Sequence, residues 1–279
     1  MMQSTIRIAD KQFQIGNFHS LDVTLSYIEA PTGGQPLILL HGVGSRWQPF
    51  QSILPQLAEV YHVFALDLRG HGQSSHTPGA YRLVDYTEDV YHFITEQFQA
   101  PVVIYGHSLG ALVGIYLASQ HPELVRALIL GDPPLYHHNT LTKDTFWQTA
   151  FTDLLDFIAA HPDPVEMDAW LAQNMPGMPP ERRTERVQSL KTLDAGVVRA
   201  VIDNTQMEGV SLSACVSQIR CPVLLLRGNP DLGSALREQD VAFALEHFQK
   251  IGVLNMETVG HGIIPVSLLQ DIMEFINRL

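Results

Sequence analysis

The segment Gly106-His107-Ser108-Leu109-Gly110 places one serine between two glycines, directly after an apolar run and directly before a run of small residues. A strand, a sharp turn and a helix are the setting in which a G-x-S-x-G segment exposes its serine hydroxyl for nucleophilic attack. A serine that only caps a helix would not need glycines on both sides. The pattern therefore predicts that Ser108 is a nucleophile at a nucleophile elbow.

A nucleophilic serine needs a base, and the base needs an acid that orients it. His261 lies between two glycines near the C-terminus, after the last run that resembles a strand. Asp231 follows the apolar run CPVLLLRG, and Asp132 ends the apolar run VRALILGD. The chain order serine, aspartate, histidine is one of the known orders of a catalytic triad. We expect His261 as the base and favour Asp231 as the acid, with Asp132 as the alternative.

Two backbone N–H groups aimed at one point would complete such a site as an oxyanion hole. Leu109 follows the serine and can supply one of them. Val43 lies in the turn His41-Gly42-Val43-Gly44, which follows an apolar run, and can supply the other. The same glycines do not form a dinucleotide fingerprint, because the position of the third glycine is a tryptophan, Trp47.

Short apolar runs alternate with amphipathic stretches along much of the chain, which predicts an α/β fold with parallel strands covered on both faces. The continuous apolar runs span residues 36–42, 61–67, 101–107, 125–132 and 221–228. Residues 133–213 contain no such run and read as helical throughout. We therefore expect residues 1–132 and 214–279 to form an α/β core, with residues 133–213 inserted as a helical cap.

The cap supplies candidates for a substrate pocket. Residues 145–160 carry apolar side chains on two faces, so one face can meet the core and the other can meet a substrate. Trp147 and Phe151 lie on one of these faces, and Trp47 follows the turn near Val43. The run ERRTER at residues 181–186 is interpreted as a solvated helix face, although basic residues on a cap could also meet an anionic substrate.

Five motifs in order resemble the α/β-hydrolase superfamily, in its branch of serine esterases with a helical cap. They are HGVG at 41–44, DLRGHGQS at 67–74, GHSLG at 106–110, RGNPD at 227–231 and GHG at 260–262. The resemblance covers nearly the whole chain. It implies a mostly parallel eight-stranded sheet flanked by helices, with the cap inserted after the sixth strand. It also implies that no cofactor is required.

The expected reaction is acyl transfer to water from an ester, lactone or thioester of a small, moderately apolar substrate. Hydrolysis of a carbon–carbon bond in a ring-cleavage product is an alternative, and a weakly catalytic receptor for a small ligand is another. The serine at residue 108 disfavours halide displacement and epoxide opening, because members with those activities carry aspartate at the elbow.

Composition limits the partners and the compartment. The chain has 279 residues and a formal net charge of -12, which disfavours nucleic acid and anionic membrane surfaces. The start of the sequence does not read as a signal peptide, and no apolar run approaches the length of a membrane span. The histidines lack metal-ligand spacing, and two cysteines do not make a disulfide scaffold. We expect a cytoplasmic protein that acts on a small molecule without a metal.

Overall fold

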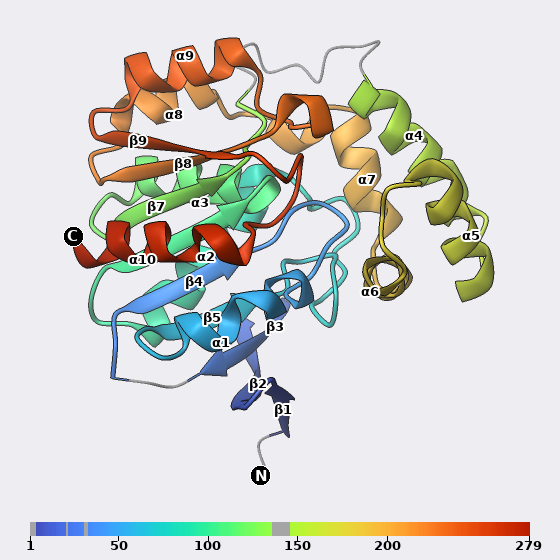
Figure 1. Ribbon diagram of the computed structural model, residues 1–279, viewed down its shortest axis with the longest axis horizontal. Helices are drawn as coiled ribbons and strands as arrows, with labels where there is room; N and C mark the ends of the chain where they lie inside the picture. The colour runs from blue at the N-terminus through green and yellow to red at the C-terminus, as the bar shows by residue number, and fades with distance from the viewer. Residues whose placement is uncertain (1–3, 21, 31–32, 136–145) are drawn as a thin grey trace.

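The computed structural model describes residues 4–20, 22–30, 33–135 and 146–279, apart from the side chain of Phe146 (Figure 1). Within these residues nine strands form one sheet in the order β1-β2-β3-β5-β4-β6-β7-β8-β9. The strands are β1 (Ser4–Ile8), β2 (Lys11–Ser20), β3 (Val23–Ala30), β4 (Pro36–Leu40), β5 (His62–Leu66), β6 (Val102–His107), β7 (Val125–Gly131), β8 (Val223–Gly228) and β9 (Ile251–Met256).

The apolar runs of the sequence form the parallel centre of this sheet. β5, β4, β6, β7, β8 and β9 are parallel neighbours, whereas β1, β2 and β3 pair antiparallel and β3 joins β5 antiparallel. β6 is buried along its whole length, as expected for a strand covered on both faces. The α/β prediction and the mostly parallel sheet are confirmed.

The expected number of eight strands is corrected to nine by the hairpin of β1 and β2. Ile8 pairs with Lys11 across a two-residue turn, in which Ala9 takes a φ of +52°. β1 lies at the edge of the sheet and is mostly exposed. Its sequence therefore contains no continuous apolar run that would predict a strand. Its pairing with β2 is what makes it a strand.

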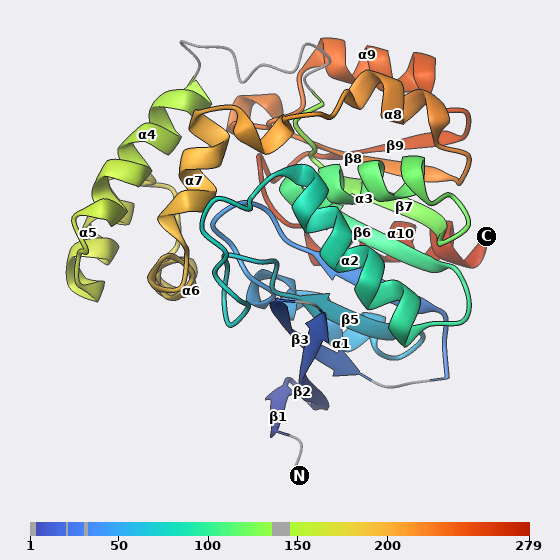
Figure 2. The same cartoon turned by 180° about the vertical axis from the view of Figure 1, so that it is seen from behind.

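Helices cover both faces of the sheet, and alternate strand residues point into two separate cores. In β4, Ile38 and Leu40 belong to one core, and Leu37 and Leu39 belong to the other. Figure 2 shows the helices of the first face and Figure 1 those of the second. The first core receives α2 (Leu83–Gln97), α3 (Leu109–Gln120), α8 (Leu212–Gln218) and α9 (Glu238–His247), and the second receives α1 (Leu54–Leu57) and α10 (Leu269–Asn277).

Between β7 and β8 the described residues are helical and contain no strand. α4, α5, α6 and α7 gather beyond the ends of the parallel strands, where Figures 1 and 2 both place them. α8 instead packs against α3 and α9 of the core. The division into a core and a cap at residues 133 and 213 stays a prediction. These helices are α4 (Phe146–Ala159), α5 (Pro164–Asn174), α6 (Pro180–Lys191) and α7 (Ala195–Ile202), followed by the short 3-10 helix η2 (Thr205–Met207).

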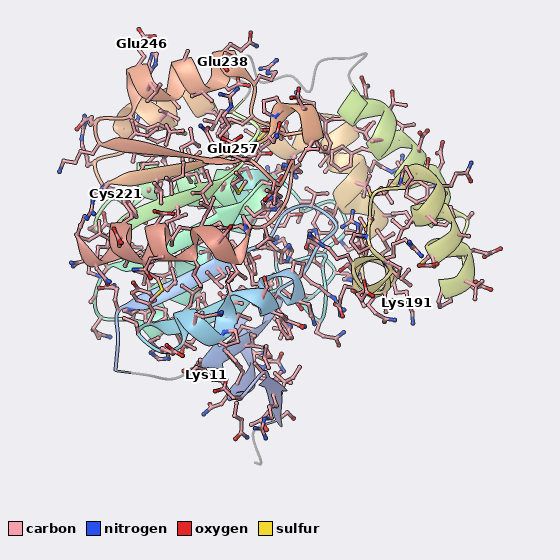
Figure 3. All side chains as sticks on the ribbon, in the orientation of Figure 1. Lys11, Lys191, Cys221, Glu238, Glu246 and Glu257 are labelled. Carbon is pink, nitrogen blue, oxygen red and sulfur yellow. The ribbon has the colours of Figure 1, made fainter. Side chains whose placement is uncertain are left out.

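Charged side chains mark the outer surface of these layers. In Figure 3, Glu246 on α9 and Lys191 at the end of α6 lie on the outside of the molecule, and both residues are exposed. None of the described helices is long and apolar enough to span a lipid bilayer.

Candidate active site

Ser108 stands at a strained turn between β6 and α3. Its φ of +51° and ψ of -113° are unusual for a residue with a side chain, and such a conformation costs about 1–3 kcal/mol. A Cβ at Gly106 would lie 2.2 Å from the Gly110 carbonyl oxygen, and one at Gly110 would lie 2.3 Å from the Leu40 carbonyl oxygen. Both glycines are therefore required by the close approach of backbone, as predicted for a nucleophile elbow.

His261 connects the Ser108 hydroxyl to a buried carboxylate. Its Nε2 lies 3.0 Å from Ser108 Oγ, and its Nδ1 lies 2.7 Å from Asp132 Oδ2. The histidine follows β9 in a loop where Gly260 leaves no room for a side chain, since a Cβ there would lie 1.9 Å from the Leu232 carbonyl oxygen. The two contacts form one hydrogen-bonded chain from serine through histidine to aspartate.

Asp132 is held in a pocket of hydrogen-bond donors at the end of β7. Its side chain is fully buried, and its φ is +44°. The carboxylate accepts hydrogen bonds from Ala235 N at 2.7 Å, from Ser234 Oγ at 2.5 Å and from Gly228 N at 3.1 Å. Burial alone would raise the pKa of Asp132, but the hydrogen bonds from His261 and Ser234 outweigh it and hold that pKa below its usual value. Asp132 is therefore ionised at neutral pH.

The expected contact between Asp231 and His261 is corrected by this geometry. Asp231 lies in the 3-10 helix η3 (Pro230–Leu232), where it is exposed and its N–H donates to Asn229 Oδ1. Both ring nitrogens of His261 already have partners, Asp132 and Ser108. β8 ends beside β7, so both aspartates follow neighbouring strands, but the left-handed turn at Asp132 is the one that brings a carboxylate to the imidazole.

Val43 and Leu109 lie beside this chain of three residues. Both line the same cavity as Ser108 and His261. Leu109 is the first residue of α3, where a helix leaves its N–H groups unpaired. Val43 lies in a turn closed by the hydrogen bond from Ser45 N to the Gly42 carbonyl, 3.1 Å long. Neither the Val43 nor the Leu109 N–H finds an acceptor within the described part of the chain.

A buried histidine fixes the turn that carries Val43. Gly44 N donates to His71 Nε2 at 3.0 Å, and His71 Nδ1 donates to the Arg69 carbonyl at 2.9 Å. Burial, with the nearby charge of Arg186, lowers the pKa of His71 to about 4. The imidazole is therefore neutral near pH 7, which leaves Nε2 free to accept. The DLRGHGQS segment thus positions the turn that carries Val43 through the hydrogen bond between His71 and Gly44.

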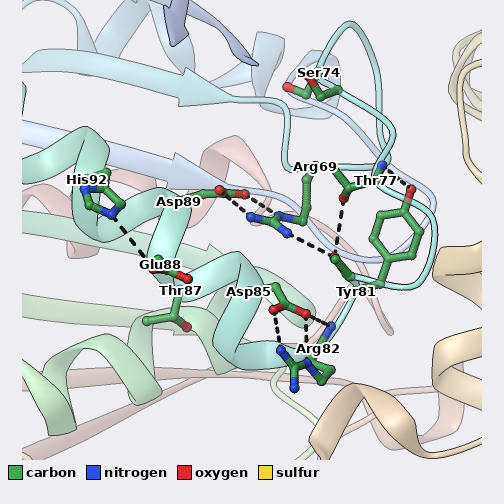
Figure 4. A network of polar contacts seen from close by, with 12 residues as sticks. Arg69, Ser74, Thr77, Tyr81, Arg82, Asp85, Thr87, Glu88, Asp89 and His92 are labelled. Atoms are coloured by element: carbon green, nitrogen blue, oxygen red, sulfur yellow. Dashed lines mark hydrogen bonds and ion pairs between the residues drawn. The ribbon is translucent and has the colours of Figure 1, made fainter. Parts of the chain in front are cut away.

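The loop between β5 and α2 contains this segment and is tied to α2 by the ionic contacts of Figure 4 and to α7 by a further hydrogen bond. Arg69 makes two hydrogen bonds of 2.6 Å to the carboxylate of Asp89 on α2. Tyr81 Oη donates to Asp194 Oδ2 at 2.7 Å, and Asp194 caps the start of α7. The loop therefore joins helices of two different regions of the chain.

The cavity in front of Ser108 and His261 has mainly apolar walls, and its empty volume, including the part open to solvent, is about 690 Å³. Trp147 and Phe151 of α4, two of the candidates from the sequence, line it, and the Trp147 ring centroid lies 5.0 Å from that of His261. Trp47 is corrected: it is buried in the second core, and it does not belong to the described lining. The remaining wall residues are Leu112, Pro134, Val201, Asn204, Gln206, Met207, Leu212 and Ala235.

The sequence analysis did not identify the residues that η2 and the residue before it bring to this wall. Asn204, Gln206 and Met207 belong to no recognisable motif, and only the path of the chain between α7 and α8 places them there. No group of three or more histidine, cysteine, aspartate or glutamate side chains within the described ranges could hold a metal ion.

Comparisons with known proteins agree with this architecture. The 2-(acetamidomethylene)succinate hydrolase of Mesorhizobium japonicum is 27% identical over 215 residues, which are 74% of this chain and 74% of that protein. The pimeloyl-(acyl-carrier protein) methyl ester esterase of Neisseria meningitidis is 37% identical over 100 residues, 36% of this chain and 37% of that protein.

A solved structure and a family model extend the likeness. The crystal structure of E-2-(acetamidomethylene)succinate hydrolase superposes with a TM-score of 0.74 at 20% identity, covering 95% of this chain and 99% of that one. A family model described as the alpha/beta hydrolase fold matches residues 35–179. The chain therefore belongs to the alpha/beta hydrolase family.

Proposed function

We propose that this chain is a serine hydrolase that cleaves an ester-type bond through an acyl-enzyme on Ser108. The hydrogen-bonded chain from Ser108 through His261 to Asp132 carries this proposal. Because ionised Asp132 can only accept, Nδ1 of His261 holds the ring proton, and Nε2 is left as the base toward the Ser108 hydroxyl.

In the first half-reaction, Nε2 of His261 takes the Ser108 proton as Oγ attacks the substrate carbonyl. The N–H groups of Val43 and Leu109 would hold the oxyanion of the tetrahedral intermediate. The imidazolium formed beside Asp132 then gives its proton to the leaving group. In the second half-reaction the same base activates a water molecule, which releases the acid and restores Ser108.

Residues 133–213 would act as the cap that shapes the substrate cavity. Trp147 and Phe151 give the cavity an aromatic wall, which favours a moderately apolar group on the substrate. Esters, lactones and thioesters fit this description. The similarity to a methyl ester esterase supports the ester reading over the matched 100 residues.

A second candidate is the hydrolysis of a bond other than an ester, including a carbon–carbon bond in a ring-cleavage product. The similarity to 2-(acetamidomethylene)succinate hydrolase supports this second candidate, because it covers more of the chain than the similarity to the methyl ester esterase does. A panel of esters and an acylaminomethylene-succinate substrate, assayed side by side, separates the two by kcat/KM.

The first test is labelling with a fluorophosphonate probe, followed by mass spectrometry of the peptides. We expect one adduct, on the peptide that contains Ser108, and none in a Ser108→Ala variant. Turnover of at least one carbonyl substrate must accompany the adduct. Absence of the adduct in the folded protein would contradict the proposal. An adduct with ligand-induced stabilisation but no turnover would favour a receptor built on the same fold.

A further inference from the structure

Two polar residues outside the chain of Ser108, His261 and Asp132 belong to the described lining of the cavity, Asn204 and Gln206, and Gln206 is the one of these two with an unsatisfied buried donor. It lies in η2, and it lines the same cavity as Ser108 and His261. The residue is only 7% exposed. A long polar side chain is thus buried in the wall of a substrate cavity.

The carboxamide of Gln206 lacks a partner that burial normally demands. Its Nε2 is buried and has no hydrogen-bond partner among the residues that the structure describes. An unsatisfied buried donor costs about 1–3 kcal/mol, so proteins rarely keep one without a use for it. Nε2 itself has almost no exposed surface, so a ligand in the cavity that offers an acceptor oxygen would remove this cost once the carboxamide turns toward it.

The segment that carries Gln206 is held in place on both sides. Asn204 takes the left-handed conformation with a φ of +59°, which turns the chain out of α7. Val210 N donates to the Met207 carbonyl at 3.1 Å, and Thr205 Oγ1 lies 3.4 Å from the Ala200 carbonyl oxygen. The backbone that carries Gln206 is therefore fixed on both sides, as the support of a group that selects a ligand should be.

The residues of the cavity wall favour an uncharged ligand group over a charged one. The wall also contains the neutral Asn204 and apolar side chains such as Val201 and Leu212, and no lysine or arginine occurs in the described lining. A carboxylate brought into these surroundings would lose its hydration without gaining a counterion. An uncharged carbonyl or amide oxygen loses far less hydration free energy on entering the cavity.

We propose that the Gln206 carboxamide binds an uncharged carbonyl or amide oxygen on the acyl chain of the substrate, separate from the carbonyl that Ser108 attacks. This inference rests on the proposed function and narrows its substrate class to oxo- or amido-substituted acyl groups. Gln206 is a specificity residue in this assignment, because it acts on a part of the substrate that does not react.

The test compares matched acyl chains in one assay. The substrates are 4-nitrophenyl esters of 4-oxopentanoate, 5-oxohexanoate and 6-oxoheptanoate, each beside its unsubstituted parent and beside the hemi-ester in which a carboxylate replaces the terminal acetyl group. We expect kcat/KM of the wild type to favour one oxo ester over its parent by about tenfold, the size of one buried hydrogen bond. In Gln206→Met this ratio falls to about one.

Two controls separate binding from structure. Gln218→Met makes the same chemical change at the exposed end of α8, and it should keep the wild-type ratio. Gln206→Met should unfold at a midpoint equal to or above that of the wild type, because it removes an unsatisfied donor. Gln206→Leu provides a second variant if the methionine does not fold.

The outcomes also separate this inference from the proposed function. An active Gln206 variant that keeps the oxo preference overturns the inference alone, as does a wild type that prefers the carboxylate esters or shows no oxo preference at any length. A wild type that neither hydrolyses any of these esters nor takes the fluorophosphonate on Ser108 overturns the proposed function, and the inference with it.

Discussion

At the scale of single residues, the environment of Asp132 explains how one carboxylate can hold the imidazole of His261 in place. Its oxygens accept from His261, Ser234 and backbone N–H groups, so the negative charge is fully engaged although the side chain is buried. Such a carboxylate keeps the proton on Nδ1 and stabilises the imidazolium as it forms.

Replacement of Asp132 by asparagine should lower kcat by roughly 10³–10⁴-fold, because the amide no longer fixes the ring tautomer. The matched variant Asp231→Asn should keep kcat within about twofold of the wild type, as expected for a change at an exposed side chain. Steady-state kinetics on one ester, with unfolding midpoints of both variants, make the comparison. Loss of turnover in Asp231→Asn with activity kept in Asp132→Asn would reverse the assignment.

Ser108 and His261 could be found from the sequence, because glycines on both sides mark the turns that expose them. The acid could not be chosen in the same way. Asp132 and Asp231 both follow apolar strands, and the choice depends on a left-handed turn and on donors from residues 228–236 that fold toward Asp132. Gln206 carries no pattern at all, since its role depends on what surrounds it.

At the scale of elements, α6 and the turn at Gly42–Ser45 are joined by charged side chains. Arg186 of α6 donates from Nη1 to the Gly44 carbonyl, and Arg46 pairs with Glu185 at 3.1 Å. The N–H of the same glycine, Gly44, donates to Nε2 of His71. The turn that carries Val43 is therefore fixed from the core and from α6 together.

The interpretation of residues 181–186 as a solvated face is corrected in part by these contacts. Arg186 is half-buried against the turn, and burial lowers its pKa to about 10, which still leaves it cationic at neutral pH. Composition alone could not separate it from its neighbours, because the charged run has the same residue types on every side of the helix.

Loss of the Arg186 contact should loosen the turn and so weaken the oxyanion binding that we propose for the Val43 N–H. We expect Arg186→Gln to lower kcat about tenfold with a smaller change in KM, since a hydrogen bond to a charged donor contributes about 1.5–3 kcal/mol, only part of which reaches the transition state. Arg183→Gln is the matched control, because Arg183 pairs with Asp168 within the helices that follow β7. Equal losses in both variants would indicate a general effect on α6 instead.

At the scale of the whole molecule, the parallel sheet brings the site residues together at the carboxyl ends of its strands. Ser108 follows β6, Asp132 follows β7 and Val43 follows β4, so residues far apart in sequence meet where the carboxyl ends of neighbouring strands end. Hydrophobic runs predicted these strands because burial on both faces requires them. The antiparallel edge and the placement of α4 to α7 depend on contacts between distant segments, which no local pattern records.

Several neutral imidazoles are buried near the site, and their burial makes the stability of the fold depend on pH. Burial lowers the pKa of His71 to about 4 and that of His107 to about 3, and it lowers the pKa of His41 in the same direction. An unfolded histidine titrates near 6.5. Between these values the unfolded chain binds more protons than the folded one, so the free energy of unfolding falls as the pH falls.

The buried carboxyls of Asp67 and Asp89 oppose this trend without reversing it, because burial raises the pKa of each. Burial raises the pKa of Asp67 to about 6, so that group alone would stabilise the fold as the pH falls toward 4. The three histidines outweigh these carboxyls, and a net loss on the order of 4 kcal/mol is expected between pH 7 and pH 5. Urea unfolding at constant ionic strength across this range measures the loss directly. A free energy of unfolding that stays level or rises toward pH 5 would mean that these imidazoles are charged, or reach water, in the folded protein, and His71 could then no longer accept from Gly44.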